Sequence, residues 1–207
     1  MQGKLRVRTL VVVSLGILFL TGCVNLGKGT ERLPRLYVLT PMASTTEGGS
    51  VAGKIEGTIG IGPLAMPEYL NRPQIVTRGD GHQLQAAPFA NWAEPLKQNV
   101  MRVLADNISV LARNDAVYSY PWRVGYAPRY QLQVAVVQFD ADRNREATLI
   151  VRWEWVDQVG VPMMTRRRSV LRAPLQGQGD EAVVDAMSRL LMEYSRMAIA
   201  VLEEKIR

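Results

Sequence analysis

One tetrapeptide, Leu20-Thr21-Gly22-Cys23, limits which part of this 207-residue chain can fold as a domain. A basic N-terminal stretch and an uncharged run from Thr9 to Leu20 precede the cysteine. Because a helix that crosses a bilayer needs about 20 apolar residues, this shorter run indicates a signal peptide rather than a membrane anchor. Small residues directly before a cysteine form the lipobox of bacterial lipoproteins. The pattern therefore predicts that residues 1–22 are removed and that a lipid is attached to Cys23.

The predicted lipid on Cys23 determines where the protein works. Burying each methylene group of an acyl chain contributes about 0.8 kcal/mol, so two or three chains hold a protein stably on a membrane. In lipoproteins of this kind an aspartate after the cysteine favours the inner membrane, and Val24 stands there instead. We therefore expect a lipid-anchored protein on the periplasmic face of the outer membrane, with residues 23–34 as its tether. The alternative is an ordinary secretory signal whose cysteine falls at the cleavage site by chance.

The mature chain is long enough for one domain and short for two. Removing residues 1–22 leaves 185 residues and takes away three of the 25 basic residues, so that 22 basic residues stand against 19 acidic ones. The resulting net charge of +3 gives little support to nucleic-acid binding. Cys23 is the only cysteine and His82 the only histidine. Internal disulfides, histidine pairs for a metal and histidine relays are therefore excluded.

Two kinds of periodicity occur along the mature chain. Alternating or continuous apolar residues predict strands at residues 35–39, 55–61, 74–77, 83–85, 130–139, 147–155 and 163–171. Apolar residues spaced three and four apart predict amphipathic helices at residues 91–113 and from Asp180 almost to the C-terminus. Pro63 is expected to end the second strand. One helical turn is expected at Pro67–Leu70, and the turn Gly79-Asp80-Gly81 should join the third and fourth strands as a hairpin.

The predicted elements define a fold class. Each helix has one apolar stripe, and such a stripe must be buried against another element. The strand at residues 130–139 is apolar on both alternations, which is typical of a central strand covered on both sides. The later strands should follow one another as a meander. We therefore predict a single α/β domain over residues 35–207, in which two long amphipathic helices cover a mixed sheet with prominent antiparallel pairing.

The candidate site residues favour recognition over catalysis. The acidic residues fall at predicted turns, helix faces and strand ends and form no known catalytic motif, so we expect no enzymatic activity. Tyr69 and Arg72 lie in a proline-bracketed loop and belong to types enriched at interface hot spots, although Tyr69 could equally plug the sheet edge. Trp122 lies in a second loop beside Arg123. The run Arg166-Arg167-Arg168 either keeps an edge strand soluble or meets anionic headgroups or an acidic partner.

Several features of the chain occur in the same order in one protein family. They are the lipobox ending at Cys23 and the stretches Tyr37–Leu39, Ile59–Pro63, Pro67–Arg78, Phe89–Leu96 and Tyr120–Trp122. On these residues, of which Pro67–Arg78 is the most specific stretch, the chain resembles the PqiC-like (YmbA) family of ABC-type transport auxiliary lipoproteins. The resemblance extends over essentially the whole mature chain. It implies a small α/β domain similar to the three-layer fold of the TolB N-terminal region.

The resemblance also implies a function in lipid transport between two membranes. Such lipoproteins work with a periplasmic MCE-domain (mammalian cell entry) protein and an inner-membrane transporter component, as an outer-membrane dock that supports envelope integrity. The family implies a chemical role for one residue, Cys23, which carries covalent acyl chains such as palmitate, and it implies no other cofactor. We expect self-association as well, because closed rings are the simplest way to surround a periplasmic tube. Two other functions stay open: an assembly factor for another outer-membrane machine, and a lipoprotein hydrolase.

Overall fold

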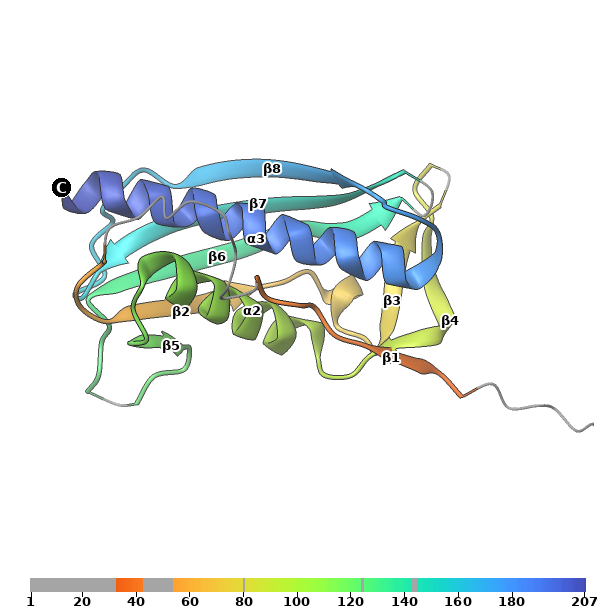
Figure 1. Ribbon diagram of the computed structural model, residues 1–207, viewed down its shortest axis with the longest axis horizontal. Helices are drawn as coiled ribbons and strands as arrows, with labels where there is room; N and C mark the ends of the chain where they lie inside the picture. The colour runs from red at the N-terminus through yellow and green to blue at the C-terminus, as the bar shows by residue number, and fades with distance from the viewer. Residues whose placement is uncertain (1–32, 43–53, 80, 124, 143–144) are drawn as a thin grey trace, which may run out of the picture. The chain divides into compact units, whose positions relative to one another are not determined.

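A mixed sheet of eight strands, with two α-helices packed on it, makes up the described part of the chain (Figure 1). The computed structural model describes residues 33–42, 54–79, 81–123, 125–142 and 145–207. In order, the elements are β1 (Arg35–Tyr37), β2 (Ile59–Ala65), the 3₁₀ turn η1 (Glu68–Leu70), β3 (Gln74–Arg78), β4 (Leu84–Trp92), α2 (Leu96–Ala112), β5 (Val117–Ser119), β6 (Tyr130–Asp142), β7 (Glu146–Asp157), β8 (Arg167–Pro174) and α3 (Gly179–Ile206). The predicted signal peptide, the lipobox and most of the tether lie outside the described residues.

The long strand β6 lies at the centre of the sheet. β7 pairs with one edge of β6 in antiparallel orientation, from Tyr130 beside Asp157 to Ala141 beside Ala147. The other edge is shared, because β2 pairs in parallel with the first part of β6 and β3 in parallel with its last residues. β8 extends the sheet beyond β7, β5 extends it beyond β2, and β4 and β1 extend it beyond β3. The predicted central strand and the meander of strands after it are confirmed.

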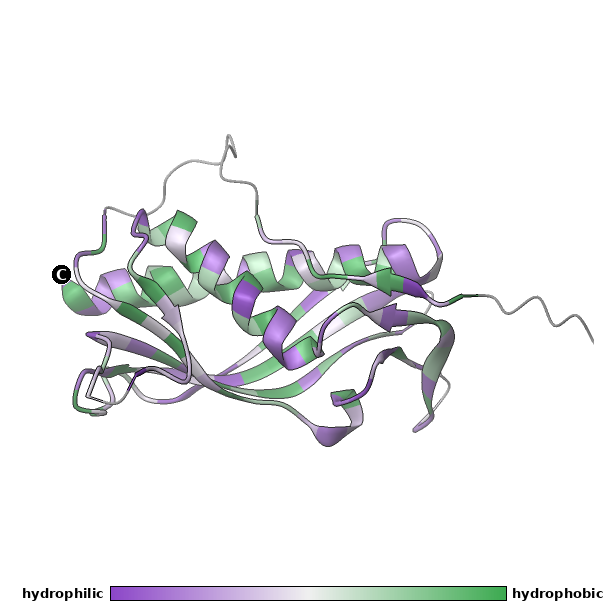
Figure 2. Cartoon of the chain, turned by 90° about the horizontal axis from the view of Figure 1, so that it is seen from below, coloured by the Kyte–Doolittle hydropathy of each residue, from purple (hydrophilic) through white to green (hydrophobic). Residues whose placement is uncertain are grey.

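Both helices pack on the same face of this sheet. α3 contacts β6, β7 and β8, α2 contacts β2 and β5, and the two helices contact each other. Figure 2 shows them together on one side of the strands. Neither described helix is long and apolar enough to cross a membrane. The predicted fold class, an α/β domain whose mixed sheet is covered by two amphipathic helices, is confirmed.

Two buried tryptophans of β7 bond to the neighbouring elements, Trp155 to α3 and Trp153 to β8. Trp155 Nε1 donates a hydrogen bond of 2.9 Å to the carbonyl oxygen of Ala198 in α3. Trp153 Nε1 donates a hydrogen bond of 2.9 Å to the hydroxyl of Ser169 in β8. The Trp153 ring also meets the Tyr194 ring of α3 edge-on, with centroids 5.7 Å apart. Each indole therefore buries a large apolar surface while its one polar atom has a partner.

The Tyr194 hydroxyl is an exception in this core. It is buried without a hydrogen-bond partner, and burial raises the pKa of Tyr194 well above its usual value. A buried polar group without a partner costs roughly 1–3 kcal/mol, so Tyr194→Phe should raise the free energy of unfolding by about 1 kcal/mol. Urea unfolding followed by tryptophan emission measures this difference. A loss of stability of similar size would show that the hydroxyl does have a partner.

The first long helix begins later than the sequence pattern indicated. The prediction was residues 91–113, whereas α2 spans Leu96–Ala112. Pro95 stands at the N-cap and has no backbone N–H to donate, so regular helical bonding starts only after it. Trp92 has the spacing of the helix stripe but ends β4, where it pairs in parallel with Tyr37 of β1. Helical spacing alone therefore could not place this boundary.

The prediction that Pro63 ends the second strand is wrong. β2 spans Ile59–Ala65 and passes through Pro63. The register between β2 and β6 shifts between Ile61 and Leu64, so Pro63 lies at an irregularity of the ladder. A bulge is one of the few places where a strand accepts proline, because the missing N–H costs no regular ladder bond there.

The second face of the sheet is also different from the prediction. Neither α-helix of the described chain covers it, and Val137 of β6 and Val170 of β8 are 39% and 41% exposed. The expectation that residues 130–139 are covered on both sides is therefore wrong. Val137 lies at a register shift between β6 and β7, where its apolar side chain interrupts the alternation without being buried. An antiparallel sheet can leave one face in water, and this part of the sheet does so.

The predicted hairpin and helical turn are both confirmed. β3 and β4 pair in antiparallel orientation, and the N–H of Gly79 donates to the carbonyl oxygen of Gln83 at 3.0 Å across the turn. Between β2 and β3 the turn η1 begins directly after Pro67. These two features bring the loop after η1 and the end of β4 into position for the site described next.

Candidate functional site

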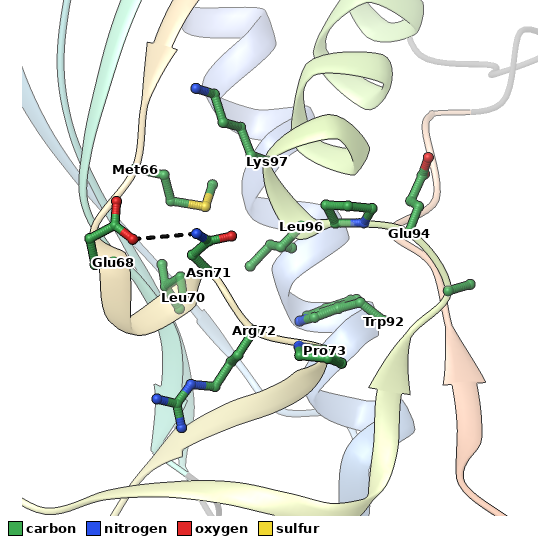
Figure 3. A pocket seen from close by; sticks show the side chains of 12 residues that line it. Met66, Glu68, Leu70, Asn71, Arg72, Pro73, Trp92, Glu94, Leu96 and Lys97 are labelled. Carbon is green, nitrogen blue, oxygen red and sulfur yellow. Dashed lines mark hydrogen bonds between the residues drawn. The ribbon is translucent and has the colours of Figure 1, made fainter.

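A pocket of about 430 Å³ opens between the loop after η1 and the start of α2 (Figure 3). Two segments of the chain form it, residues 66–73 and residues 92–97. The lining residues are Met66, Glu68, Leu70, Asn71, Arg72, Pro73, Trp92, Ala93, Glu94, Pro95, Leu96 and Lys97. Apolar walls combined with a few charged groups are typical of binding pockets.

The first segment is held by a short turn and a buried anchor. The N–H groups of Leu70 and Asn71 donate to the carbonyl oxygens of Pro67 and Glu68, each at 3.0 Å. The Asn71 side-chain amide donates to the Glu68 carboxylate at 3.3 Å, the bond dashed in Figure 3. Leu70 is buried in the core, so the turn is fixed on the sheet. Arg72 follows on the exposed side of this turn.

The second segment is held by the sheet and by α2. The N–H of Trp92 donates to the carbonyl oxygen of Pro73 at 2.7 Å, which joins the two segments directly. Arg102 of α2 donates to the Glu94 carboxylate through Nε at 3.1 Å and Nη2 at 2.8 Å. Glu94 is therefore already neutralised by an intramolecular partner. Lys97 is exposed and, like Arg72, makes no ion pair within the described ranges.

A buried carboxylate, Asp140 of β6, fixes η1 to the sheet. Asp140 is fully buried and accepts hydrogen bonds of 2.8 Å from the Tyr69 hydroxyl and 2.8 Å from the Gln138 amide. Arg78 of β3 donates two more, from Nε at 2.8 Å and Nη2 at 3.1 Å. Charge-assisted bonds of this kind are the strong ones in proteins. The network joins η1, β3 and β6 and so fixes the loop that carries Arg72.

The same network changes the acidity of its donors. Burial raises the pKa of Tyr69 to about 12, and the hydrogen bond to Asp140 and the charge of Asp140 add to this rise. The hydrogen bond to Asp140 also raises the pKa of Arg78 above its usual value. Both donors therefore keep their protons near neutral pH, and Asp140 keeps its partners.

Stability should fall in alkaline solution through Tyr69. Its pKa of about 12 in the folded state exceeds the ordinary value of 10.0, so the native state holds the proton more tightly than the unfolded chain. This contribution is complete below about pH 10 and is lost as the pH rises through about 12. Tyr69→Phe removes the titrating proton, so the stability of the variant should decline less steeply over this range. Urea unfolding at a series of pH values tests this, and parallel pH profiles would contradict it.

Tyr69 and Arg72, the two loop residues proposed for recognition, have different environments in the structure. Tyr69 is partly buried against the core, bonds to Asp140 and does not line the pocket. This geometry fits the alternative in which Tyr69 packs on the sheet. Arg72 is exposed at the pocket, and its role in recognition stays a prediction.

Trp122 and the three consecutive arginines lie away from the pocket. The Trp122 ring meets the Tyr120 ring edge-on, with centroids 5.3 Å apart, and lies so close to Gly60 that a Cβ there would come within 2.7 Å of it. Trp122 therefore packs over β2. Arg166 pairs with Glu154 just before β8, which begins at Arg167 and not at the predicted residue 163. Arg167 and Arg168 are exposed on β8, and neither forms an ion pair with any residue that the structure describes.

The residues of the second segment were not among the predicted site residues. The available signal was that Pro67–Arg78 and Phe89–Leu96 both belong to the family resemblance, and the structure brings these two stretches together. The role of Asp140 was also missed. Asp140 stands between the apolar residues Phe139 and Ala141 on a strand, a pattern that predicts an outward-facing acid and so hides its burial. Its donor Tyr69 is 71 positions away along the chain, and no spacing rule connects residues so far apart.

The pocket lining combines apolar side chains with amide and charged groups. The lining includes no hydroxyl, thiol or imidazole group that could act as a nucleophile. Among the described residues, no group of three or more His, Cys, Asp or Glu side chains could hold a metal ion. What remains is an apolar wall, two acids with internal partners, Glu68 with the Asn71 amide and Glu94 with Arg102, and two cations without ion-pair partners in the described chain.

The chain belongs to the family of ABC-type transport auxiliary lipoprotein components, whose family model matches residues 37–198. The match extends from Tyr37, the last residue of β1, through most of α3 and includes both segments of the pocket. It confirms the resemblance to the PqiC-like family. It also gives a general function, that of an auxiliary lipoprotein in ABC-type transport, and thus a partnership with transporter components.

Solved structures share this fold. Protein XCC0632 from Xanthomonas campestris, assigned to DUF330, matches with a TM-score of 0.67 at 14% sequence identity, over 83% of this chain and 95% of that chain. A crystal structure of an uncharacterized protein matches with a TM-score of 0.60 at 19% identity, over 84% of this chain and 99% of that chain. No curated protein matches the sequence. At these identities the likeness shows the fold alone.

Proposed function

We propose that the protein is the outer-membrane docking subunit of an MCE-type intermembrane lipid transport system and has no enzymatic activity of its own. Its family supplies the general part of this function, an auxiliary lipoprotein of an ABC-type transporter. The specific part concerns place and partner. The acylated Cys23 holds the domain on the periplasmic face of the outer membrane, and a periplasmic MCE-domain protein connects it to the inner-membrane component.

One observation carries the proposal of a docking site. Pro67–Arg78 and Phe89–Leu96, the longest stretches of the family resemblance, contribute to opposite sides of a single pocket. Within the described residues, Arg72 and Lys97 have no ion-pair partner, whereas the two acids of the lining have internal partners, Glu94 in Arg102 and Glu68 in the Asn71 amide. Cations without partners beside an apolar wall match a partner segment that carries both acidic and apolar side chains.

Reversing the charge of Arg72 should prevent recovery of the MCE-domain partner while the domain stays folded. Arg72 is exposed, so Arg72→Glu should change the free energy of unfolding by no more than about 0.5 kcal/mol. The new carboxylate would face an acidic segment, and like charges in an interface cost enough to lower recovery by about tenfold or more. A pull-down from solubilised envelopes measures recovery, and urea unfolding measures stability.

Arg196→Glu is the matched control. Arg196 is exposed on α3, does not line the pocket and makes no ion pair in the described ranges. Its charge reversal should leave recovery unchanged. Equal loss in both variants would reveal a general charge effect, and full recovery with folded Arg72→Glu would remove the pocket from the interface.

The same pull-down separates docking from the two alternatives. Recovery of an MCE-domain protein supports docking, and recovery of an outer-membrane assembly complex supports an assembly factor. Turnover of an envelope substrate that one point mutation abolishes would support a hydrolase. Self-association into a ring is part of the proposal, and sedimentation of the protein as a monomer at high concentration would count against it.

A further inference from the structure

Exposed apolar side chains gather on and beside β1. Leu33, Leu36 and Val38 are 83%, 66% and 46% exposed, and Phe89 on the neighbouring strand β4 is 45% exposed. We call these four residues the edge patch. Within the described sheet, β1 pairs only with β4, so the edge patch lies at the rim of the sheet.

The edge patch belongs to a fixed part of the domain. Leu36 lies beside Asn91 of β4, two positions after Phe89, so the two strands place Leu36 and Phe89 near each other. The next residues of the chain turn inward, because Leu39 is 1% exposed. The N–H of Leu39 donates to the Asn99 side chain of α2 at 3.2 Å, which holds the strand against that helix. The outward side chains therefore have a defined orientation.

We propose that the edge patch rests in the interfacial region of the phospholipid bilayer that holds the lipid of Cys23. This inference relies on the acylation of Cys23 in the proposed function. Leu33 follows Cys23 by ten positions, a length of chain that extends to at most about 35 Å. The bilayer is thus always within reach of this edge, and tethering makes even weak contacts populated because the effective concentration is high.

The chemistry of β1 and β4 suits a lipid surface. Neither strand contains an acidic residue, so anionic headgroups meet no repulsion from them. Arg35 precedes Leu36 on β1 and pairs with Asp180 of α3 at 3.4 Å, so this cation lies on the opposite face of the strand from Leu36. Exposed apolar side chains on strands without acidic residues suit the interfacial region of a bilayer.

The protein offers a direct test because Cys23 is its only cysteine. In the lipidated protein that thiol is blocked, so Leu36→Cys or Phe89→Cys introduces one free thiol for an environment-sensitive nitrobenzoxadiazole probe. The labelled lipoprotein is reconstituted into vesicles of phosphatidylethanolamine and phosphatidylglycerol, with or without brominated acyl chains. Bromine in the acyl chains quenches probes that enter the bilayer.

Two valines supply matched controls. Val159 and Val161 are 82% and 55% exposed, and they lie in the turn between β7 and β8, at the end of the sheet where α3 finishes and away from β1 (Figure 1). Like Leu33, Leu36 and Val38 they are exposed aliphatic side chains, but they lie elsewhere on the domain. Val159→Cys and Val161→Cys should therefore carry the same probe in water.

Brominated lipid should quench the probe at Leu36 and Phe89 several-fold more than at the two control positions, with emission shifted to the blue. Equal quenching at all four positions would overturn the proposal. A blue shift at the edge patch without bromine quenching would overturn it as well, because a protein partner or a second copy would then cover the patch. Labelling of the wild-type chain would show a free Cys23 and remove the anchor on which the inference depends. Partner recovery is measured independently, so absent quenching leaves the docking function standing.

Discussion

Asp140→Ala should lower the free energy of unfolding by about 3 kcal/mol, because it leaves a buried arrangement of donors without its acceptor. Asp140 is fully buried and accepts hydrogen bonds from Tyr69, Gln138 and Arg78. Removing one partner of a buried ion pair costs more than the pair contributed, since the remaining charge has no water to replace the lost contact. Part of the Arg78 side chain reaches solvent, which keeps the expected loss at the lower end of the usual range.

Urea unfolding of Asp140→Ala, of Asp140→Asn and of a surface control measures this contribution. Asp140→Asn keeps the shape but loses the charge, so its loss of stability should be smaller. Asp106→Ala is the control, because Asp106 is 50% exposed and lies 3.8 Å from Arg102. Such an exposed pair contributes about 0.5 kcal/mol. Equal losses at positions 106 and 140 would contradict the structural importance of the buried network.

Cys23→Ala should abolish acylation completely and leave the precursor uncleaved. Transfer of the diacylglyceryl group needs a thiol as the nucleophile, and alanine provides none. The protein would then keep residues 1–22, and the mature lipoprotein would be absent from the outer membrane. Incorporation of radiolabelled fatty acid and the mass of the purified protein measure both effects. Equal label in the variant and the wild type would refute the lipobox.

Val24→Asp is the matched variant for this experiment. It retains the thiol, so acylation and cleavage should proceed as in the wild type. The sorting rule predicts that only the membrane changes, from outer to inner. Separation of the two membranes by density, followed by detection of the lipoprotein, reports the location. An unchanged location would show that the residue after the cysteine does not direct sorting here.

The fold could be predicted wherever a periodic pattern was long. In α2 and α3 the apolar stripe extends over more than two turns, and in β6 and β7 the alternation extends over several residue pairs. The apolar residues of these patterns are the ones buried in the core. Errors arose where one residue is compatible with two different local structures. Pro63 ends most strands, but a bulge accepts it. Trp92 fits a helix stripe by spacing, but Pro95 delays the helix and leaves Trp92 to the sheet.

The candidate site was harder to predict than the fold because its parts come from distant segments. Arg72 was identified correctly as exposed, from its place between prolines in a loop. Tyr69 in the same loop looks equivalent in sequence, yet its hydroxyl bonds to an acid 71 positions away. Residues 66–73 and residues 92–97 meet because the β3–β4 hairpin folds the chain back on itself. The turn of this hairpin can be recognised from local sequence, but the contact between the two segments cannot.

The position of α3 at the end of the element order affects how an exported chain can fold. Trp153 and Trp155 of β7 find Tyr194 and Ala198 only in the second half of this helix. Until those residues have been synthesised, the apolar face of β6 and β7 has no cover, and the sheet cannot close its core. Protein export of the general secretory kind threads an unfolded polypeptide through a narrow channel. A domain whose last helix completes its core cannot close that core until nearly the whole chain is available, so this order of elements suits the export that the predicted signal peptide implies.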